Sequence, residues 1–200
     1  DAPFRIISPK PAMEPVDLGN HFVGRVHDTI LKAFFKNPSP HLLKLDELHL
    51  AGEDTSEFQI ISGFDGFVLP PDSVHHLDLT FQPGSVGKKQ VQLLAVTPTD
   101  TVSVQLTAQG LIRRYDMPNE QIDMGQIKVG ETNDSTLVLM MNRGNSALKI
   151  GDIHIDGPGR AGFNILEGSD SETVYPHGRK KVTVSFKPGY RGRSNGRLHF

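Results

Sequence analysis

One eight-residue stretch occurs twice in this chain and decides its fold. Residues 17–24 read DLGNHFVG, and residues 123–130 read DMGQIKVG. Both follow the pattern Asp, apolar residue, Gly, three variable residues, Val-Gly, and the second copy begins 106 positions after the first. Recurrence of an ordered pattern at a fixed period indicates a tandem array of one structural unit. The sequence therefore predicts two copies of one domain.

Other short motifs recur in the same order along both halves. Residues 58–60 (FQI) correspond to 163–165 (FNI), and residues 81–87 (FQPGSVG) correspond to 186–192 (FKPGYRG). The offset is 105 or 106, so the copies differ by single-residue insertions that we assign to loops. We predict two domains, spanning residues 1–110 and 111–200, each near the commonest domain size.

Composition excludes several functional classes. The 200 residues carry a net charge of −2 and contain no cysteine, so disulfides and cysteine-zinc sites are excluded. The charge gives no field that favours nucleic acid, and no apolar run approaches the roughly 20 residues of a membrane span. We expect neither a nucleic-acid partner nor membrane insertion. The first residues, DAPF, are not a signal peptide; they suit the start of a mature exported protein or a boundary inside a longer one.

Alternation of apolar and polar residues predicts β-strands with one buried face. Residues 77–81 read LDLTF, and the corresponding residues 182–186 read VTVSF, so every second side chain should point into a core. Further strands are expected at residues 29–35, 91–95, 102–108 and 136–141. No stretch favours a helix. The predicted fold class is all-β, with two tandem β-sandwiches.

Turn residues mark the corners of these sandwiches. Pro83 and its counterpart Pro188 should end strands, because proline cannot donate to a β-ladder. Residues 17–24 are predicted to form a similar corner near the first strand. Asn37 and Asn142 fall where strands should end, and we expect left-handed backbone there, which asparagine tolerates.

The second copy stops before the first one does. Phe200 aligns with Ala95, and the first copy continues through residues 96–110, which include a complete predicted strand. We expect the second domain to lack its last strand. We favour the explanation that the sequence is a piece of a longer protein; the alternative is that the second domain accepts a strand from a neighbour by β-augmentation.

The order of these motifs resembles the ASH-type immunoglobulin-like module, named for ASPM and hydin, and its bacterial relatives, the choice-of-anchor D domains. The first copy departs from the family pattern at Asn37-Pro38-Ser39, where Asn-x-Gly is usual, and at Pro71-Asp72, where Gly is common. The resemblance implies non-catalytic spacer, scaffold or docking modules in large exported, surface, ciliary or centrosomal proteins. The matching positions are Leu18-Gly19, Val23-Gly24, Phe58, Ile60, Leu69-Pro70, Phe81, Pro83, Val104, Leu106 and Gly110, then Met124-Gly125, Val129-Gly130, Asn142, Gly144, Phe163, Ile165, Pro176, Gly178, Phe186 and Pro188.

No motif predicts catalysis, a cofactor or a metal. His75 and His76 are adjacent in a strand, so they should face opposite sides, and none of the nine histidines has a zinc-motif spacing. Gly192-Arg-Ser-Asn-Gly196 matches the letters of a nucleophile elbow, but a strand-like stretch follows where the elbow needs a helix. We predict that the protein is not an enzyme.

A run of basic residues near the end of the chain is the one charge feature. No Asp or Glu falls between Tyr175 and Phe200. We consider a face that binds polysaccharide or another anion, and we favour a solvated strand edge. The residues of this run are Arg179, Lys180, Lys181, Lys187, Arg191, Arg193 and Arg197.

These observations favour a structural and protein-interaction module in a repeat array of a large exported or cell-surface bacterial protein. Its partners would be other proteins or neighbouring repeats, with strand donation to the second copy as one mode. Its location would be extracellular, on the cell surface or periplasmic. The alternatives are a ciliary, centrosomal or cytoplasmic scaffold module, and an anion- or carbohydrate-binding accessory module of an enzyme.

Overall fold

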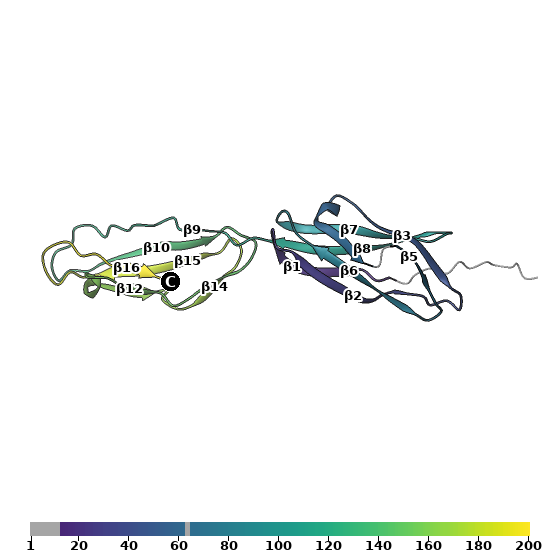
Figure 1. The fold of residues 1–200 in the computed structure, drawn as a ribbon. Helices are drawn as coiled ribbons and strands as arrows, with labels where there is room; N and C mark the ends of the chain where they lie inside the picture. The colour runs from purple at the N-terminus through teal and green to yellow at the C-terminus, as the bar shows by residue number, and fades with distance from the viewer. Residues whose placement is uncertain (1–12, 63–64) are drawn as a thin grey trace, which may run out of the picture. The chain divides into compact units, whose positions relative to one another are not determined.

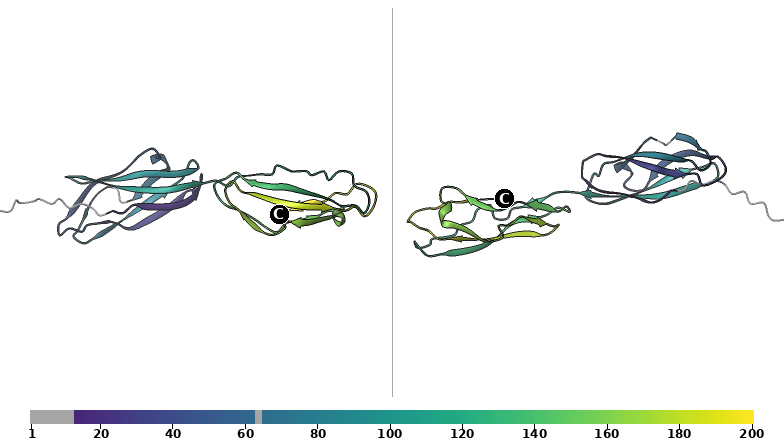
Figure 2. Two further views of the ribbon diagram at one scale, coloured as in Figure 1. Left: turned by 180° about the vertical axis from the view of Figure 1, so that it is seen from behind. Right: turned by 90° about the horizontal axis from the view of Figure 1, so that it is seen from below.

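The computed structural model describes residues 13–62 and 65–200. By its internal contacts the chain divides into two compact units, residues 1–111 and residues 112–200. Within the described ranges every regular element is a β-strand or a single 3₁₀ turn (Figures 1 and 2), which confirms the all-β prediction. Each unit has the immunoglobulin-like β-sandwich fold.

The first unit packs a five-stranded sheet against a three-stranded one. The larger sheet has the order β1-β8-β7-β3-β5, and the smaller has the order β2-β6-β4. The strands are β1 (Val16–Phe22), β2 (His27–Lys36), β3 (Leu43–Ala51), β4 (Phe58–Ser62), β5 (Asp65–Leu69), β6 (Val74–Phe81), β7 (Gly87–Val96) and β8 (Thr101–Leu111), with the 3₁₀ turn η1 (Thr55–Glu57) before β4.

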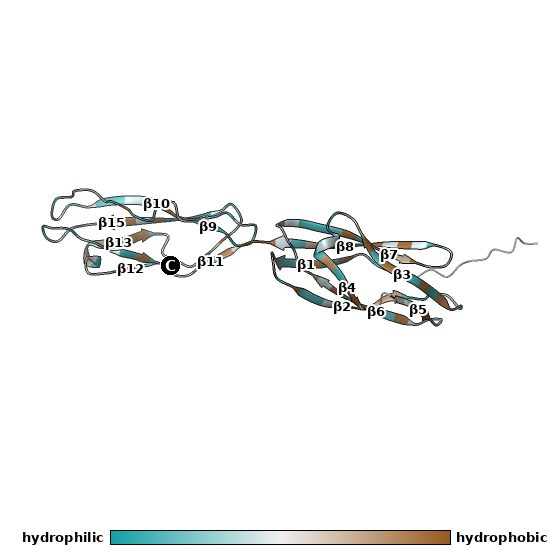
Figure 3. Ribbon diagram, turned by 45° about the horizontal axis from the view of Figure 1, so that its top comes forward, coloured by the Kyte–Doolittle hydropathy of each residue, from teal (hydrophilic) through white to brown (hydrophobic). Residues whose placement is uncertain are grey.

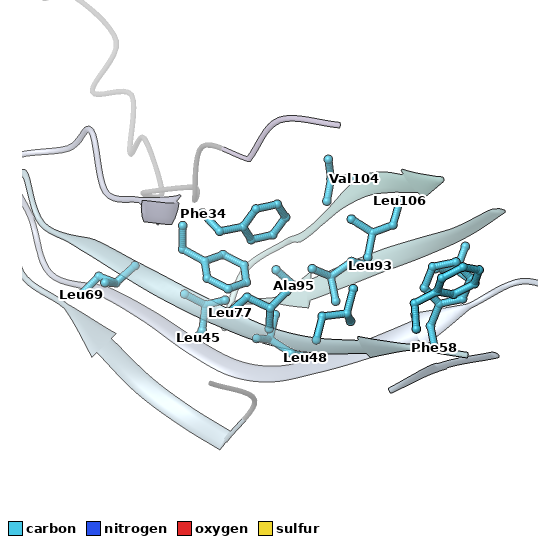
Figure 4. Close-up of a cluster of buried hydrophobic side chains, with 14 of the residues drawn as sticks. Phe34, Leu45, Leu48, Phe58, Leu69, Leu77, Leu93, Ala95, Val104 and Leu106 are labelled. Carbon is cyan, nitrogen blue, oxygen red and sulfur yellow. The ribbon is translucent and has the colours of Figure 1, made fainter. Parts of the chain in front are cut away.

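Alternating side chains from both sheets form the core of the first unit. Figure 3 shows hydrophobic and hydrophilic residues alternating along these strands, and Figure 4 shows Leu77, Leu93 and Leu106 meeting between the sheets. All three are fully buried. The predicted inward rows at residues 77–81 and 91–95 are confirmed, because each contributes three side chains to this core.

The second unit repeats part of this plan, with shorter strands where it corresponds to β3, β5 and β7. One sheet has the order β13-β15-β10-β9, and two strand pairs, β11-β14 and β12-β16, complete the unit. The elements are β9 (Tyr115–Asp116), β10 (Asn133–Asn142), β11 (Leu148–Ile150), β12 (His154–Asp156), η2 (Arg160–Gly162), β13 (Phe163–Glu167), β14 (Glu172–Val174), β15 (Arg179–Phe186) and β16 (Arg197–His199).

Corresponding strands of the two units pair in the same register. His49 lies opposite Leu94 in the β3–β7 pair, and the residues 105 positions later, His154 and His199, lie opposite each other in the β12–β16 pair. Likewise, β4 pairs with β6 and β13 pairs with β15, and the first residue pair of each is a Phe opposite a Phe. The same sequence pattern has therefore produced the same local pairing.

The units differ at one edge. In the first, β8 lies between β7, to which it is antiparallel, and β1, to which it is parallel. Every residue from 112 to 200 is described, and this range contains no counterpart of β8. Residues 122–128, which correspond to β1, form no strand. The prediction that the second sandwich lacks its last strand agrees with this arrangement.

Two predictions about corners were wrong. Residues 17–22 belong to strand β1, where Gly19 has a φ of 81° at an irregularity in the pairing, and only Val23 and Gly24 lie in the turn that follows. Asn37 and Asn142 do not have left-handed backbone. That conformation occurs instead at Asp72 and His177, which lie across from the asparagines in the next turn.

Candidate functional site

The open edge of the second unit is the candidate site. β16 pairs with β12 along one side only, whereas β7 of the first unit is also covered by β8 over ten residue pairs. Leu93 of β7 is 0% exposed, but its counterpart Leu198 is only half-buried. An uncovered strand edge presents backbone N–H and C=O groups that another strand can pair with.

Residues 122–128, which correspond to β1, likewise pair with no strand in the second unit. Ile122 and Phe200 are 42% and 45% exposed, and neither Ile122 nor Met124 joins the hydrophobic cluster of the second unit. Their counterparts Val16 and Leu18 pack against the first core. Ile122 and Met124 therefore lack the packing against a core that Val16 and Leu18 have in the first unit.

Local structure at the start of this segment is nevertheless preserved. The Asp123 carboxylate accepts a hydrogen bond from the Gly125 amide at 2.9 Å, and Asp17 accepts one from Gly19 at the same distance. Gly125 has a φ of 79°, close to the 81° of Gly19. The backbone bend of β1 is thus already formed in residues 123–125, without the strand pairing that accompanies it in the first unit.

The residues of the predicted basic run do not form one surface, because they lie at different places in the second unit. Arg179 and Lys181 are exposed on β15, and Lys187 is exposed just after it. Lys180 is 4% exposed, with its ammonium group 2.9 Å from a Glu172 carboxylate oxygen. Lys180 therefore contributes no free cation to an anion-binding face.

Two arginines of the run share an open pocket of about 500 Å³ with Tyr190. Its rim is formed by the glycine-rich turn at residues 157–159 and by Asn195, Gly196 and Asp156. The two arginines are Arg193 and Arg197, and Arg191 is not among the lining residues. The structure thus brings together two of the arginines of this run.

Sequence reasoning missed Asp156 because it lies far from the basic run. Pairing of β12 with β16 places Asp156 opposite Arg197, and its carboxylate lies 3.1 Å from the His199 ring. Alignment of the two copies could have found this pair, because Asp156 and Arg197 correspond to Ala51 and Gln92, which lie opposite each other in the first unit. A carboxylate therefore stands beside the cations of this pocket.

The remaining candidates for chemistry have structural roles. His75 stacks on Phe67, with ring centroids 4.1 Å apart, and His76 accepts a hydrogen bond from the Ala33 amide. In the described ranges, no group of three or more His, Asp or Glu side chains is arranged to hold a metal ion. The turn at residues 192–196 leads into strand β16, so it is not a nucleophile elbow. No helix among the described residues has the length and apolar character needed to cross a bilayer.

No protein-family model matches the sequence, and no curated protein matches it. Similar solved structures include the secreted serine protease VesC from Vibrio cholerae, which is 13% identical, with 96% of this chain and 49% of that chain covered and a TM-score of 0.42. This chain thus spans about half the length of that protein.

Two further structures resemble the chain. A protein of unknown function from Porphyromonas gingivalis W83 is 14% identical, with 90% of this chain and 83% of that chain covered and a TM-score of 0.40. The ASH/PapD-like domain of human CEP192 is 16% identical, with 52% of this chain and 84% of that chain covered and a TM-score of 0.33. At these identities the likeness concerns the fold alone.

Proposed function

We propose that this chain is a non-catalytic structural and protein-interaction module. In this proposal residues 1–110 and 111–200 are successive copies of an ASH-type domain of the choice-of-anchor D branch, within the repeat array of a large exported or cell-surface bacterial protein. The observation that carries the proposal is the edge of β16 that no strand among residues 112–200 covers, together with the exposed apolar residues Ile122 and Phe200. Unpaired backbone next to apolar side chains is the surface that β-augmentation uses.

The test is site-specific photo-crosslinking in the native, full-length protein. A photoreactive residue at Ile122 should crosslink to another polypeptide or to a neighbouring repeat. The control is the same residue at Val86, which is exposed in the turn before β7, a strand that is paired on both sides. Equal crosslinking at both positions, or none at Ile122, would contradict an interaction role for this edge.

The cellular context is tested by mass-spectrometric mapping of both mature termini of the native protein. A cleaved leader and further repeats after Phe200 are the expected result for an exported array. An uncleaved, intracellular protein would instead favour the ciliary or cytoplasmic scaffold alternative.

A second candidate function is anion or carbohydrate binding by the pocket that holds Tyr190, Arg193 and Arg197. An aromatic ring beside two guanidinium groups suits a carboxylated or sulfated sugar. Asp156 on the rim of the pocket weakens anion binding, because a carboxylate repels anions. Binding of a sulfated polysaccharide that is lost in the double variant Arg193→Glu, Arg197→Glu, but kept in Lys181→Glu, Lys187→Glu, would support this function.

A further inference from the structure

Two histidines from different strands stand next to each other on the second unit. His154 of β12 and His199 of β16 lie directly opposite each other in the antiparallel pair. Their rings are nearly parallel, with centroids 5.4 Å apart, and both residues are exposed. Residues that are directly opposite in antiparallel strands have Cβ atoms about 4.5–5.5 Å apart, so two imidazoles in this position can reach one ion.

Alternation along the two strands fixes the face on which these side chains lie. Ile155 packs against the hydrophobic cluster of the second unit, so its neighbours His154 and Asp156 point to the opposite face. Leu198 packs against the same cluster, so His199 points outward as well. The strand pair therefore presents two imidazoles and one carboxylate on one face.

The carboxylate of Asp156 contacts one ring of the histidine pair. Its Oδ1 atom lies 3.1 Å from Nε2 of His199. In metal sites, a carboxylate beside one ring nitrogen of a histidine fixes the tautomer, orients the ring and raises the basicity of the other nitrogen. This contact leaves Nδ1 of His199 as the atom that can bind an ion.

The first unit lacks this arrangement, although its strands pair in the same register. His49 corresponds to His154 but lies opposite Leu94. Ala51 stands where the second unit has Asp156. The second unit therefore differs from the first at this place by one added imidazole and one added carboxylate, and both are groups that a metal site uses.

A second histidine pair lies in the first unit and has different surroundings. The rings of His21 and His27 are stacked with centroids only 3.9 Å apart, and both residues are half-buried. Nε2 of His21 also lies 2.6 Å from the carbonyl oxygen of Leu18. We expect this pair to bind no ion, and it provides an internal control.

One cation lies near the outward-facing pair. Arg197 is opposite Asp156 in the β12–β16 pair and is exposed. A guanidinium group at this position repels a metal ion and lowers its affinity, but it occupies neither imidazole. The charge of Arg197 therefore weakens the site without closing it.

We propose that His154 and His199 bind one divalent transition-metal ion, with Asp156 as the positioning residue for His199. Imidazole suits Zn²⁺, Cu²⁺ and Ni²⁺, whereas Ca²⁺ and Mg²⁺ prefer oxygen ligands. In the described ranges no third His, Asp or Glu side chain is arranged to join the pair, so water completes the coordination. The ion links β12 to β16, a role separate from the protein-interaction role proposed above.

Titration of the untagged 200-residue protein with Zn²⁺ tests the site through the NMR signals of its nine histidine rings. Zn²⁺ should shift the signals of His154 and His199 at one ion per chain and leave those of His21 and His27 unchanged. Ca²⁺ should shift none of them. Either His154→Gln or His199→Gln should abolish the shift of the remaining ring, and both positions are exposed, so the variants should fold.

Two further variants test the charges around the pair. Asp156→Asn should weaken Zn²⁺ binding about tenfold while both imidazoles remain, as expected for a residue that orients a metal ligand. Arg197→Gln should tighten binding, because it removes a repelling charge. A short Gly-Ser tail added after Phe200 should leave the affinity unchanged, which shows that the terminal carboxylate is not a ligand.

The first unit allows the converse experiment. Ala51→Asp with Leu94→His places a carboxylate and a second imidazole around His49 and should add a second Zn²⁺ site. Ala51→Asp with Leu94→Gln is the matched control, and it should add none because it lacks the second imidazole.

Three results would overturn the inference. Equal Zn²⁺ affinity of the wild-type protein and His199→Gln would show that ions bind to single exposed histidines. Shifts of His21 and His27 at lower Zn²⁺ concentrations than those of His154 and His199 would place the site in the first unit. Absence of a second site in Ala51→Asp with Leu94→His would show that an opposed histidine pair beside a carboxylate is not sufficient in this register.

Discussion

Asn37 and Asn142, 105 positions apart, occupy the same buried site in the two units and make the same hydrogen bonds. Each side-chain amide donates to a carbonyl four residues later, and to the carbonyl of Leu69 or Val174. Each side-chain oxygen accepts from the amide two residues later. Because buried backbone carbonyls need partners, each asparagine ties a loop and a neighbouring strand end to the end of β2 or β10.

Replacement of either asparagine by alanine should destabilise its own unit by about 3 kcal/mol, because it leaves at least two carbonyls unpaired in a buried site. All three tyrosines lie in the second unit, so tyrosine fluorescence during urea unfolding reports Asn142→Ala alone. The loss of stability that Asn37→Ala causes in the first unit is measured by amide hydrogen exchange. Asn20→Ala and Asn164→Ala, at exposed positions, are the matched controls. If they lower the free energy of unfolding as much as Asn37→Ala and Asn142→Ala do, the buried hydrogen bonds are not the cause.

The sequence predicted the regular part of the fold because alternation reports burial directly. Leu77, Leu79 and Phe81 face the core as their spacing requires. The same rule, extended two residues back from Val182, places Lys180 on the inward face, and its burial was therefore predictable. Grouping by charge along the chain concealed it, because the partner Glu172 lies on another strand.

Other features could not be predicted because they depend on tertiary contacts. Phe34 and Phe35 are adjacent and both buried, which breaks the alternation of β2. The cause is a register shift in the pairing with β6 and a left-handed residue, Ala33, whose amide is held by His76. Likewise, residues 16–22 and 122–128 share one pattern, but only the first is a strand, because only it has β8 beside it.

Lys89 should stabilise the first unit through a buried ion pair that the second unit lacks. Its ammonium group lies 2.6 Å from Glu57 and 3.4 Å from Asp54, and the other carboxylate oxygen of Glu57 is buried without a partner. Lys89→Met should cost about 2 kcal/mol, because removal of one partner leaves Glu57 buried and unpaired. Urea unfolding measures this loss, and Lys88→Met, at an exposed position, is the control. If Lys89→Met leaves the free energy of unfolding unchanged, the ion pair does not stabilise the first unit.

This ion pair also predicts a dependence on alkaline pH. The hydrogen bond from Lys89 to Glu57 raises the pKa of Lys89 above its ordinary value of 10.5. A raised lysine pKa contributes stability that is complete below about pH 10.5 and is lost as pH rises through the folded-state pKa. The first unit should therefore lose stability at alkaline pH more steeply in the wild-type protein than in Lys89→Met. Parallel curves for the two proteins would contradict this prediction.

His27 should make the first unit less stable in mild acid. Burial lowers the pKa of His27, and the ring of His21, stacked 3.9 Å away, lowers it further, while Asp28 acts in the opposite direction. The unfolded chain then binds a proton that the folded one resists, so the free energy of unfolding falls as pH drops below about 6.5 and levels off below the folded-state pKa. His27→Gln should flatten thermal stability between pH 7.5 and pH 5.

The exposed His41 provides the control for this titration. His41→Gln should keep the full acid dependence of the first unit, since its ring makes none of the contacts that lower the pKa of His27. If His27→Gln and wild type lose stability equally between pH 7.5 and pH 5, the stacked histidine pair is not the source of the acid dependence.

The second unit should be the less stable of the two. Its hydrophobic cluster contains eight buried residues, against sixteen in the first, and buried apolar area is the main favourable term in folding. Amides of β10 and β15 should therefore exchange with solvent at least about a hundredfold faster than those of β7 and β8, which corresponds to about 2.7 kcal/mol. Equal protection of the amides in both units would contradict this prediction, and would mean that the smaller hydrophobic cluster of the second unit costs no stability.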